Sequence, residues 1–275
     1  MSSSQMPHES NLIQTVLKAL DVMECLASTD RPLSTLEVAE LCGLSRPTAY
    51  RFLTTLLTRG YVASVEDGHY QLGTRILTLS EGLLDRLDLT KLARSELREL
   101  SQASNETVHF AILDDTEMLY IDKVESSQPV RMHSTIGTRN PLHCTAIGKA
   151  VLAFIPVEER NALLDRITFI PRTPNTITDR AALVEHLELV YTRGFAIDDI
   201  ENEEGIRCVA APVFNHTRRV FAAISISGPA YRLSIPRLLE LSTLVITAAD
   251  VISRKLGYVP QSPSLGDEKL SSLEN

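Results

Sequence analysis

The stretch LSRPTAYRFLTTLLTRGYV, residues 44–62, decides the fold of the N-terminal part of this chain. Ser45 is a residue type that caps helices, and Pro47 stands near the first helical position, where a missing N–H is harmless. Apolar side chains then recur at spacings of three and four, which predicts an amphipathic helix that ends at Gly60. Its inward face is predicted to consist of Ala49, Leu53, Leu56 and Leu57.

The residues on either side of this stretch complete a motif. Residues 11–28 carry apolar side chains at helical spacing, and Ser34 followed by Glu37 has the capping-box pattern of a short helix that stops at Gly43. Residues 61–65 and 69–72 read as two strands joined by an Asp-Gly turn. Three helices and a hairpin predict a winged helix-turn-helix at residues 11–73, after a disordered N-terminus at residues 1–10.

The start of the third helix is the predicted DNA-reading element. In a helix-turn-helix the second helix of the motif lies in the major groove, and its first residues reach the bases. Arg can pair with guanine there, while Thr and Tyr can contact a thymine methyl group or a phosphate. Which residue reads a base stays open, as does the alternative of a packing motif with a solvated polar face. The predicted DNA-binding residues are Ser45, Arg46, Pro47, Thr48, Tyr50 and Arg51.

The charge pattern is compatible with double-stranded DNA as a partner. The net charge of −8 at first argues against it, because DNA-binding domains usually carry a basic surface. However, residues 41–65 contain no Asp or Glu, and Arg46, Arg51 and Arg59 all lie there. Only the contact face must approach the phosphates, so the charge of that face, and not the net charge, determines whether the protein can bind DNA.

The composition limits the number of domains, the cellular location and the kinds of metal or cofactor site that can be expected. A chain of 275 residues with 44% hydrophobic content predicts about two folded domains. Neither a secretory signal nor a long apolar segment is found, so we expect a cytoplasmic protein without membrane contact. The four cysteines are scattered, so neither a disulfide framework nor a metal site is predicted, and no cofactor is expected.

The rest of the sequence predicts a larger α+β domain at residues 91–258, reached through a linker helix at residues 74–90. The tail at residues 259–275 is predicted to be disordered. The strands are expected to form a largely antiparallel sheet. Helices are predicted at residues 92–100, 146–154, 180–193 and 235–256, and strands at 107–113, 118–124, 195–199, 208–214 and 220–227, with 130–134 considered as a further strand.

One helix start in this domain has the features of an anion site. Residues 145–149 open a helix directly after a loop, and the free N–H groups of a first turn bind a carboxylate well. Asp198 and Cys208 occupy strand positions, and Ser225 and Ser227 alternate and so share one face of their strand. From the residues alone, these side chains could equally satisfy the sheet, fill the core or cap a turn.

The chain resembles the IclR family of bacterial regulators from about Val16 to Gly257. The stretches that carry the resemblance are residues 44–62, IGTRNPLHCTAIGKAVLA from Ile136, ENEEGIRCVAAPVFN from Glu201 and AAISISGP from Ala222. Within the family it is most similar to the subgroup that represses ketodeoxygluconate and hexuronate catabolism. The resemblance implies a GAF-like effector domain, homodimers that commonly pair into tetramers, and control of a neighbouring catabolic operon.

The resemblance also implies the residues that hold the effector, a small 2-keto acid or sugar acid such as ketodeoxygluconate. Some relatives have Gly-Ala where this chain has the bulkier Ala146-Ile147. Arg131, His133 and His143 are considered as further polar groups near the ligand. The implied effector-binding residues are the backbone of Ala146 and Ile147 and the side chains of Asp198, Cys208, Ser225 and Ser227.

Three alternatives stay open from the sequence. The chain could be an IclR-type regulator, either a repressor or an activator, of another pathway such as glyoxylate or aromatic acids. It could bind DNA without any ligand and use its C-terminal domain only to dimerise. It could also be an enzyme, with Cys208 as nucleophile, His109 or His143 as base and Asp198 as orienting group. No nucleophile elbow, P-loop or HExxH motif supports that last interpretation, so no catalytic residue is predicted.

Overall fold

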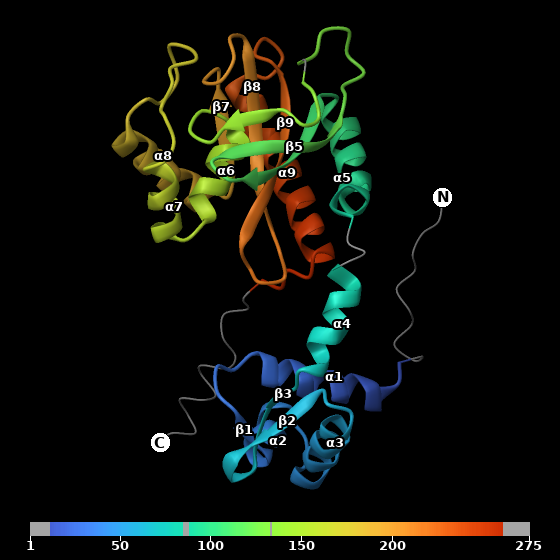
Figure 1. Ribbon diagram of the computed structural model, residues 1–275. Coiled ribbons are helices and arrows are strands. Elements are labelled where there is room, and N and C mark those ends of the chain that lie inside the picture. The colour runs from blue at the N-terminus through green and yellow to red at the C-terminus, as the bar shows by residue number, and fades with distance from the viewer. Residues whose placement is uncertain (1–11, 85–87, 133, 261–275) are drawn as a thin grey trace. The chain divides into compact units, whose positions relative to one another are not determined.

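The computed structural model describes residues 12–84, 88–132 and 134–260 (Figure 1). The chain divides into two compact units, with the division between Leu87 and Asp88. The predicted disordered N-terminus and the tail beyond Pro260 lie outside the described residues. No helix of the described segments is long and apolar enough to cross a membrane.

The first unit is a winged helix-turn-helix, as predicted from the sequence. Its helices are α1 (Gln14–Ala27), α2 (Thr35–Leu41), α3 (Arg46–Thr58) and α4 (Arg75–Leu84). Its strands β1 (Leu33–Ser34), β2 (Val62–Val65) and β3 (His69–Leu72) form an antiparallel sheet in the order β1-β3-β2. The apolar core between these elements includes Val22, Leu26, Val38, Ala49 and Leu53.

The ends of these elements follow from local chemistry, with one correction. Ser34 accepts the N–H of Glu37, whose carboxylate accepts the N–H of Ser34, so the predicted capping box is confirmed. Ser45 occupies the N-cap position of α3, but its hydroxyl lies 2.7 Å from the hydroxyl of Thr48 and caps no backbone N–H. The capping role expected for Ser45 is therefore wrong, although its place at the helix start is right.

The predicted linker helix is divided between two elements. α4 ends at Leu84, and residues 85–87 lie outside the described part of the chain. Asp88 then caps α5 (Leu89–Ser104) by accepting the N–H of Lys91 at 3.2 Å. Residues 88–90 thus begin a new helix of the second unit.

The second unit is built on a six-stranded antiparallel sheet in the order β6-β5-β4-β9-β8-β7, which confirms the predicted α+β class. The edge strand β6 was not predicted, and the described residues of the expected strand at 130–134 form none. The strands are β4 (Thr107–Asp114), β5 (Glu117–Val124), β6 (Arg139–Pro141), β7 (Ala196–Asp199), β8 (Ile206–Phe214) and β9 (Val220–Pro229).

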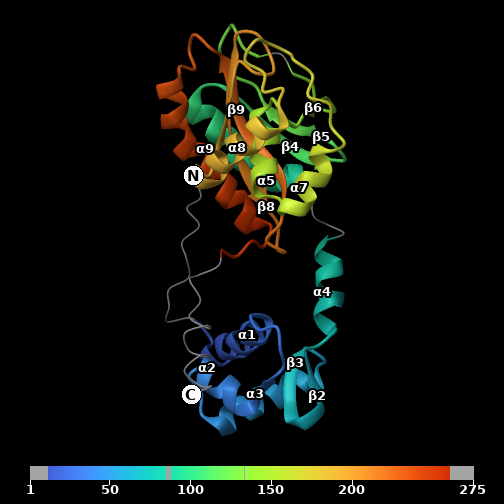
Figure 2. The ribbon, with the colours of Figure 1, turned by 90° about the vertical axis from the view of Figure 1, so that its left-hand side faces the viewer.

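Helices cover both faces of this sheet (Figures 1 and 2). α5 and α9 (Ile235–Lys255) pack on one face. α6 (Ala146–Phe154) packs on the other face, with α8 (Arg180–Arg193) against it and α7 (Val157–Leu164) on the same side. The core under α6 contains the small side chains of Ala111, Ala210 and Ala223, which let the helix approach the sheet closely.

Candidate functional site

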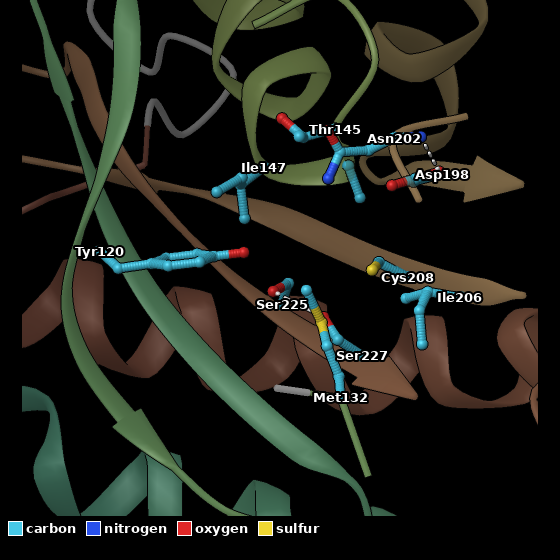
Figure 3. Close-up of a pocket in the computed structure, with 11 residues that line it drawn as sticks. Tyr120, Met132, Thr145, Ile147, Asp198, Asn202, Ile206, Cys208, Ser225 and Ser227 are labelled. Carbon is cyan, nitrogen blue, oxygen red and sulfur yellow. Dashed lines mark hydrogen bonds between the residues drawn. The ribbon is translucent and has the colours of Figure 1, made fainter. Parts of the chain in front are cut away.

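A pocket lies in the second unit, where the first turn of α6 meets the strands of the sheet (Figure 3). The empty space amounts to about 280 Å³, including the solvent at its mouth. The structure brings together here all six positions implied by the family resemblance: Ala146, Ile147, Asp198, Cys208, Ser225 and Ser227. The other residues of the lining are Tyr120, Met132, Thr145, Asn202 and Ile206.

The first turn of α6 supplies hydrogen-bond donors to this pocket. Thr145 is the N-cap, and its hydroxyl accepts the N–H of Gly148 at 3.1 Å. Among the described residues, no acceptor is found for the N–H of Ala146 or Ile147. Because the partial positive charge of a helix dipole lies at its N-terminus, these two groups favour a negatively charged ligand.

Hydroxyl and thiol groups form the opposite side of the pocket (Figure 3). Ser225 and Ser227 lie on one face of β9, with their hydroxyl oxygens 3.4 Å apart. Ser227 pairs across the ladder with Cys208 of β8, and Ser225 pairs with His109 of β4. This polar surface can donate to and accept from the oxygen atoms of a ligand.

Asp198 on β7 lies at the edge of this polar surface. It is only 2% exposed, and its carboxylate accepts the backbone N–H groups of Glu201 at 2.7 Å and Asn202 at 3.4 Å. Burial raises the pKa of Asp198 to about 7. Near neutral pH the carboxyl group is therefore present in both protonation states and can donate a proton to a ligand oxygen or accept one from it.

Among the described residues, no Lys, Arg or His side chain lines the pocket, so the N-terminal end of α6 is the electropositive element of the described lining. Of the cationic candidates, Arg131 pairs with Glu125 at 3.3 Å, and a ring nitrogen of His143 lies 3.1 Å from the carbonyl oxygen of Ile170. His133 lies outside the described residues. His109 stacks on Tyr120 behind the pocket, and burial lowers the pKa of His109 to about 3, so the ring is neutral.

The structure does not bring Cys208 together with His109 or His143 in the arrangement that the enzyme alternative requires. Cys208 is buried, and burial raises the pKa of its thiol well above the ordinary value, which disfavours the nucleophilic thiolate. A ring nitrogen of His109 lies 2.8 Å from the hydroxyl of Ser134, and His143 faces Ile170, so neither is found hydrogen-bonded to Cys208. Within the described ranges, no three His, Cys, Asp or Glu side chains gather as metal ligands.

The six predicted DNA-contacting positions lie together at the start of α3. Ala49 and Leu53 of this helix are buried in the core, which turns the predicted positions outward. Tyr50 is 55% exposed, and Arg46 and Arg51 are exposed beside it. Thr48 is half-buried, and Ser45 and Pro47 are exposed. A polar and basic helix face of this kind fits the major groove.

Thr145 was part of the anion site predicted at residues 145–149, whereas four lining residues were missed from the sequence, and two of these four carried a usable signal. Thr145 directly precedes a predicted helix and is a preferred N-cap type, so it belongs to the anion site. Tyr120 lies in a predicted strand, and Ile206 lies two residues before Cys208 on the same face of β8. Met132 and Asn202 lie in irregular segments, where no periodicity indicates a direction.

Comparisons with known proteins agree along most of the chain. Residues 15–66 match the IclR helix-turn-helix domain, and residues 81–254 match the family described as bacterial transcriptional regulator IclR C-terminal. The HTH-type transcriptional regulator KdgR of Escherichia coli is 37% identical over 94% of this chain and 98% of that protein. The transcriptional repressor IclR of the same organism is 35% identical over 89% and 90%. The crystal structure of Thermotoga maritima IclR is 36% identical, covers 89% of this chain and 99% of its own, and has a TM-score of 0.61.

Proposed function

This chain belongs to the IclR family of bacterial transcriptional regulators, and on that basis we propose that it represses an operon for sugar-acid catabolism. In this proposal, a small 2-keto acid or sugar acid such as ketodeoxygluconate fills the pocket beside α6 and relieves the repression. Members of this family are DNA-binding regulators and not enzymes. The protein would act in the cytoplasm, where its operator lies.

One observation carries the effector proposal: two N–H groups of α6, which have no acceptor in the described part of the chain, face a set of hydroxyl groups and a carboxyl group across one pocket. The N–H groups of Ala146 and Ile147 would hold the carboxylate of the ligand. Ser225, Ser227 and Asp198 would then bind its carbonyl or hydroxyl oxygens. A ligand with one carboxylate and neighbouring oxygens matches both halves of the pocket.

For DNA binding we propose that α3 enters the major groove. Arg46 and Arg51 would contact guanine or phosphate, and Tyr50 a phosphate. Thr48, Ser45 and Pro47 would lie at the same contact, where the helix begins. The absence of acidic residues between 41 and 65 keeps this face free of repulsion from the phosphates.

We further propose a homodimer that can pair into a tetramer. α1 and its N-cap residue Ile13 expose an apolar stripe, in which Ile13 is 68%, Val16 52% and Leu20 47% exposed. These residues recur at spacings of three and four on one helix face, and such a stripe is suited to contact with a second copy. A two-fold dimer would present two α3 helices to a partly palindromic operator.

The proposed regulation requires that the two states of the protein differ in effector affinity. Effector binding would change the placement of the DNA-binding units through the linker that includes α4. By linkage, an effector that binds better to the DNA-free state must weaken DNA binding by the same factor.

Calorimetric titration of the full chain tests the effector proposal. Ketodeoxygluconate is expected to bind, and glyoxylate, pyruvate and an aromatic acid are the competing candidates. Binding of one of those instead would assign another pathway. Heat of binding from none of them would favour a regulator without a ligand, whose C-terminal unit serves only assembly.

A further inference from the structure

A buried ion pair joins α6, whose first turn lines the pocket, to the turn between β7 and β8. The ammonium group of Lys149 on α6 donates to Oε1 of Glu201, and both side chains are almost completely shielded from solvent. The remaining carboxylate oxygen of Glu201, Oε2, has no hydrogen-bond partner among the described residues. Removing two charges from water costs more than an ion pair usually returns, so such a pair is weak support for stability alone. Its position suggests a different role.

Glu201 belongs to the turn between β7 and β8, which follows the pocket residue Asp198 and carries the pocket residue Asn202. Asp198 precedes this turn, and its carboxylate accepts the N–H groups of Glu201 and Asn202. Asn202 lines the pocket. Oε1 of Glu201 also accepts the N–H of Asp199 at 3.3 Å, so one carboxylate organises the turn from inside.

The turn has an unfavourable backbone conformation. Ile200 has a φ of +59°, in the left-handed region where a β-branched residue is rarely found. A conformation of this kind persists only where surrounding contacts impose it. The turn therefore depends more than an ordinary loop on the surrounding hydrogen bonds and ion pair, which we call its tethers.

The tethers hold the turn from two sides. On one side, hydroxyl groups donate to its carbonyl oxygens: Thr173 to Ile200 at 2.6 Å and Thr176 to Glu201 at 2.7 Å. On the other side, Lys149 binds the Glu201 carboxylate. His186 of α8 does not compete for this carboxylate as a cation, because burial and the neighbouring Lys149 lower its pKa to about 4.

Lys149 also connects the turn to the other half of the pocket. It lies three residues after Ala146 and two after Ile147 on α6, and the N–H groups of these two residues face the ligand site. This ion pair thus joins the helix that would hold the carboxylate to the turn that follows Asp198 and carries Asn202.

We propose that Lys149 and Glu201 are positioning residues of the effector pocket, because their ion pair holds the strained turn at Ile200 and so keeps Asp198 and Asn202 facing the first turn of α6. This inference rests on the proposed effector pocket. Neither residue needs to touch the ligand.

The test is a double variant, Lys149→Met with Glu201→Gln, which removes the ion pair without leaving an unpaired buried charge. Its matched control is Arg94→Met with Asp122→Asn. That pair has an N–O distance of 2.5 Å and joins α5 to β5 on the opposite face of the sheet. The control thus neutralises a second helix–strand ion pair that is remote from the pocket.

The first readout needs no ligand. Hydrogen exchange is measured at the amides of Glu201 and Asn202, which donate to Asp198. We expect exchange at least about tenfold faster in the double variant and unchanged in the control. Glu201→Gln alone, which keeps an acceptor for Lys149, is expected to show a smaller acceleration of about threefold, and it serves if the double variant does not fold.

The second readout is the dissociation constant of ketodeoxygluconate. We expect the double variant to bind about tenfold more weakly than the wild type, and the control to bind equally well. The positioning role would be overturned if the folded double variant exchanged both amides at the wild-type rate. It would also be overturned if the control showed the same acceleration of exchange as the double variant. If the wild type binds no ketodeoxygluconate, the proposed effector is wrong, whereas the exchange rates still decide whether the ion pair positions the turn.

Discussion

Gly148 in α6 packs directly against the backbone of Leu142: a β-carbon on Gly148 would lie 2.4 Å from the carbonyl oxygen of Leu142. Leu142 is itself buried, so its backbone has little room to move. The contact sets how deeply the first turn of α6 enters the pocket, since Ala146 and Ile147 directly precede Gly148. The N–H groups of the anion site therefore depend on a residue without a side chain.

Gly148→Ala is expected to push α6 away from Leu142 and to destabilise the folded chain by about 3 kcal/mol, as overpacking does. Effector binding should weaken as well, because the two N–H groups move. Gly68→Ala in the first unit is the control: its β-carbon meets no atom within 4 Å, and a φ of +73° costs only about 1 kcal/mol. Denaturant titration and calorimetry measure both effects, and a Gly148→Ala protein as stable as the wild type would contradict the packing role.

The protonation of Asp198 should make stability depend on pH. The folded chain keeps this proton up to about pH 7, whereas the unfolded chain releases it near the ordinary value of 3.8. Stabilisation of up to about 4 kcal/mol is therefore complete below pH 4 and lost as the pH rises to about 7. Asp198→Asn should abolish this part of the slope in denaturant titrations between these pH values. An identical slope in the variant would show that Asp198 does not hold the proton.

The hydroxyl groups of β9 should contribute directly to effector affinity. Replacing both Ser225 and Ser227 by Ala removes two donors and is expected to weaken ketodeoxygluconate binding about tenfold or more. Ser242→Ala on α9 is the control, because that hydroxyl donates to the carbonyl of Leu239, away from the pocket. Calorimetric titration compares the two proteins, and equal affinity would remove β9 from the effector site.

The exposed arginines at the start of α3 should decide operator affinity. Arg46→Ala and Arg51→Ala are each expected to cost about 1–3 kcal/mol if the side chain reads a base, with relaxed specificity at that position. A phosphate contact would instead weaken all sequences alike and reduce the salt dependence by about one ion. Arg59→Ala, at the other end of α3, is the control. Electrophoretic or fluorescence titrations that place all three variants at one affinity would argue against α3 as the reading helix.

Much of the fold could be predicted because its signals are local. The capping box of Ser34 and Glu37, the breaks at Gly43 and Gly60, and the hairpin around Gly68 all depend on neighbouring residues. The strands of the second unit were visible from their apolar runs. Alternation alone placed Ser225 and Ser227 on one face, and the structure shows that face to be the pocket.

The missed features depend on contacts between distant residues. β6 has only three residues and is a strand because it pairs with β5. No local sequence pattern predicts this pairing. The left-handed backbone of Ile200 contradicts local preference and is imposed by Thr173, Thr176 and Lys149. Asn202 enters the pocket only because of that turn. The residues on both sides of the pocket could therefore be predicted from the family resemblance. The ion pair of Lys149 and Glu201 that connects the two sides could not.

Control of DNA binding by the pocket is tested most directly by titrating the full chain onto the DNA upstream of its own gene and the neighbouring operon. The titration is made at one fixed salt concentration, with and without saturating ketodeoxygluconate. We predict tight, specific binding that ketodeoxygluconate weakens about tenfold or more, as a coupling of 1–3 kcal/mol requires. Equal operator affinity with and without an effector that calorimetry shows to be bound would contradict the account.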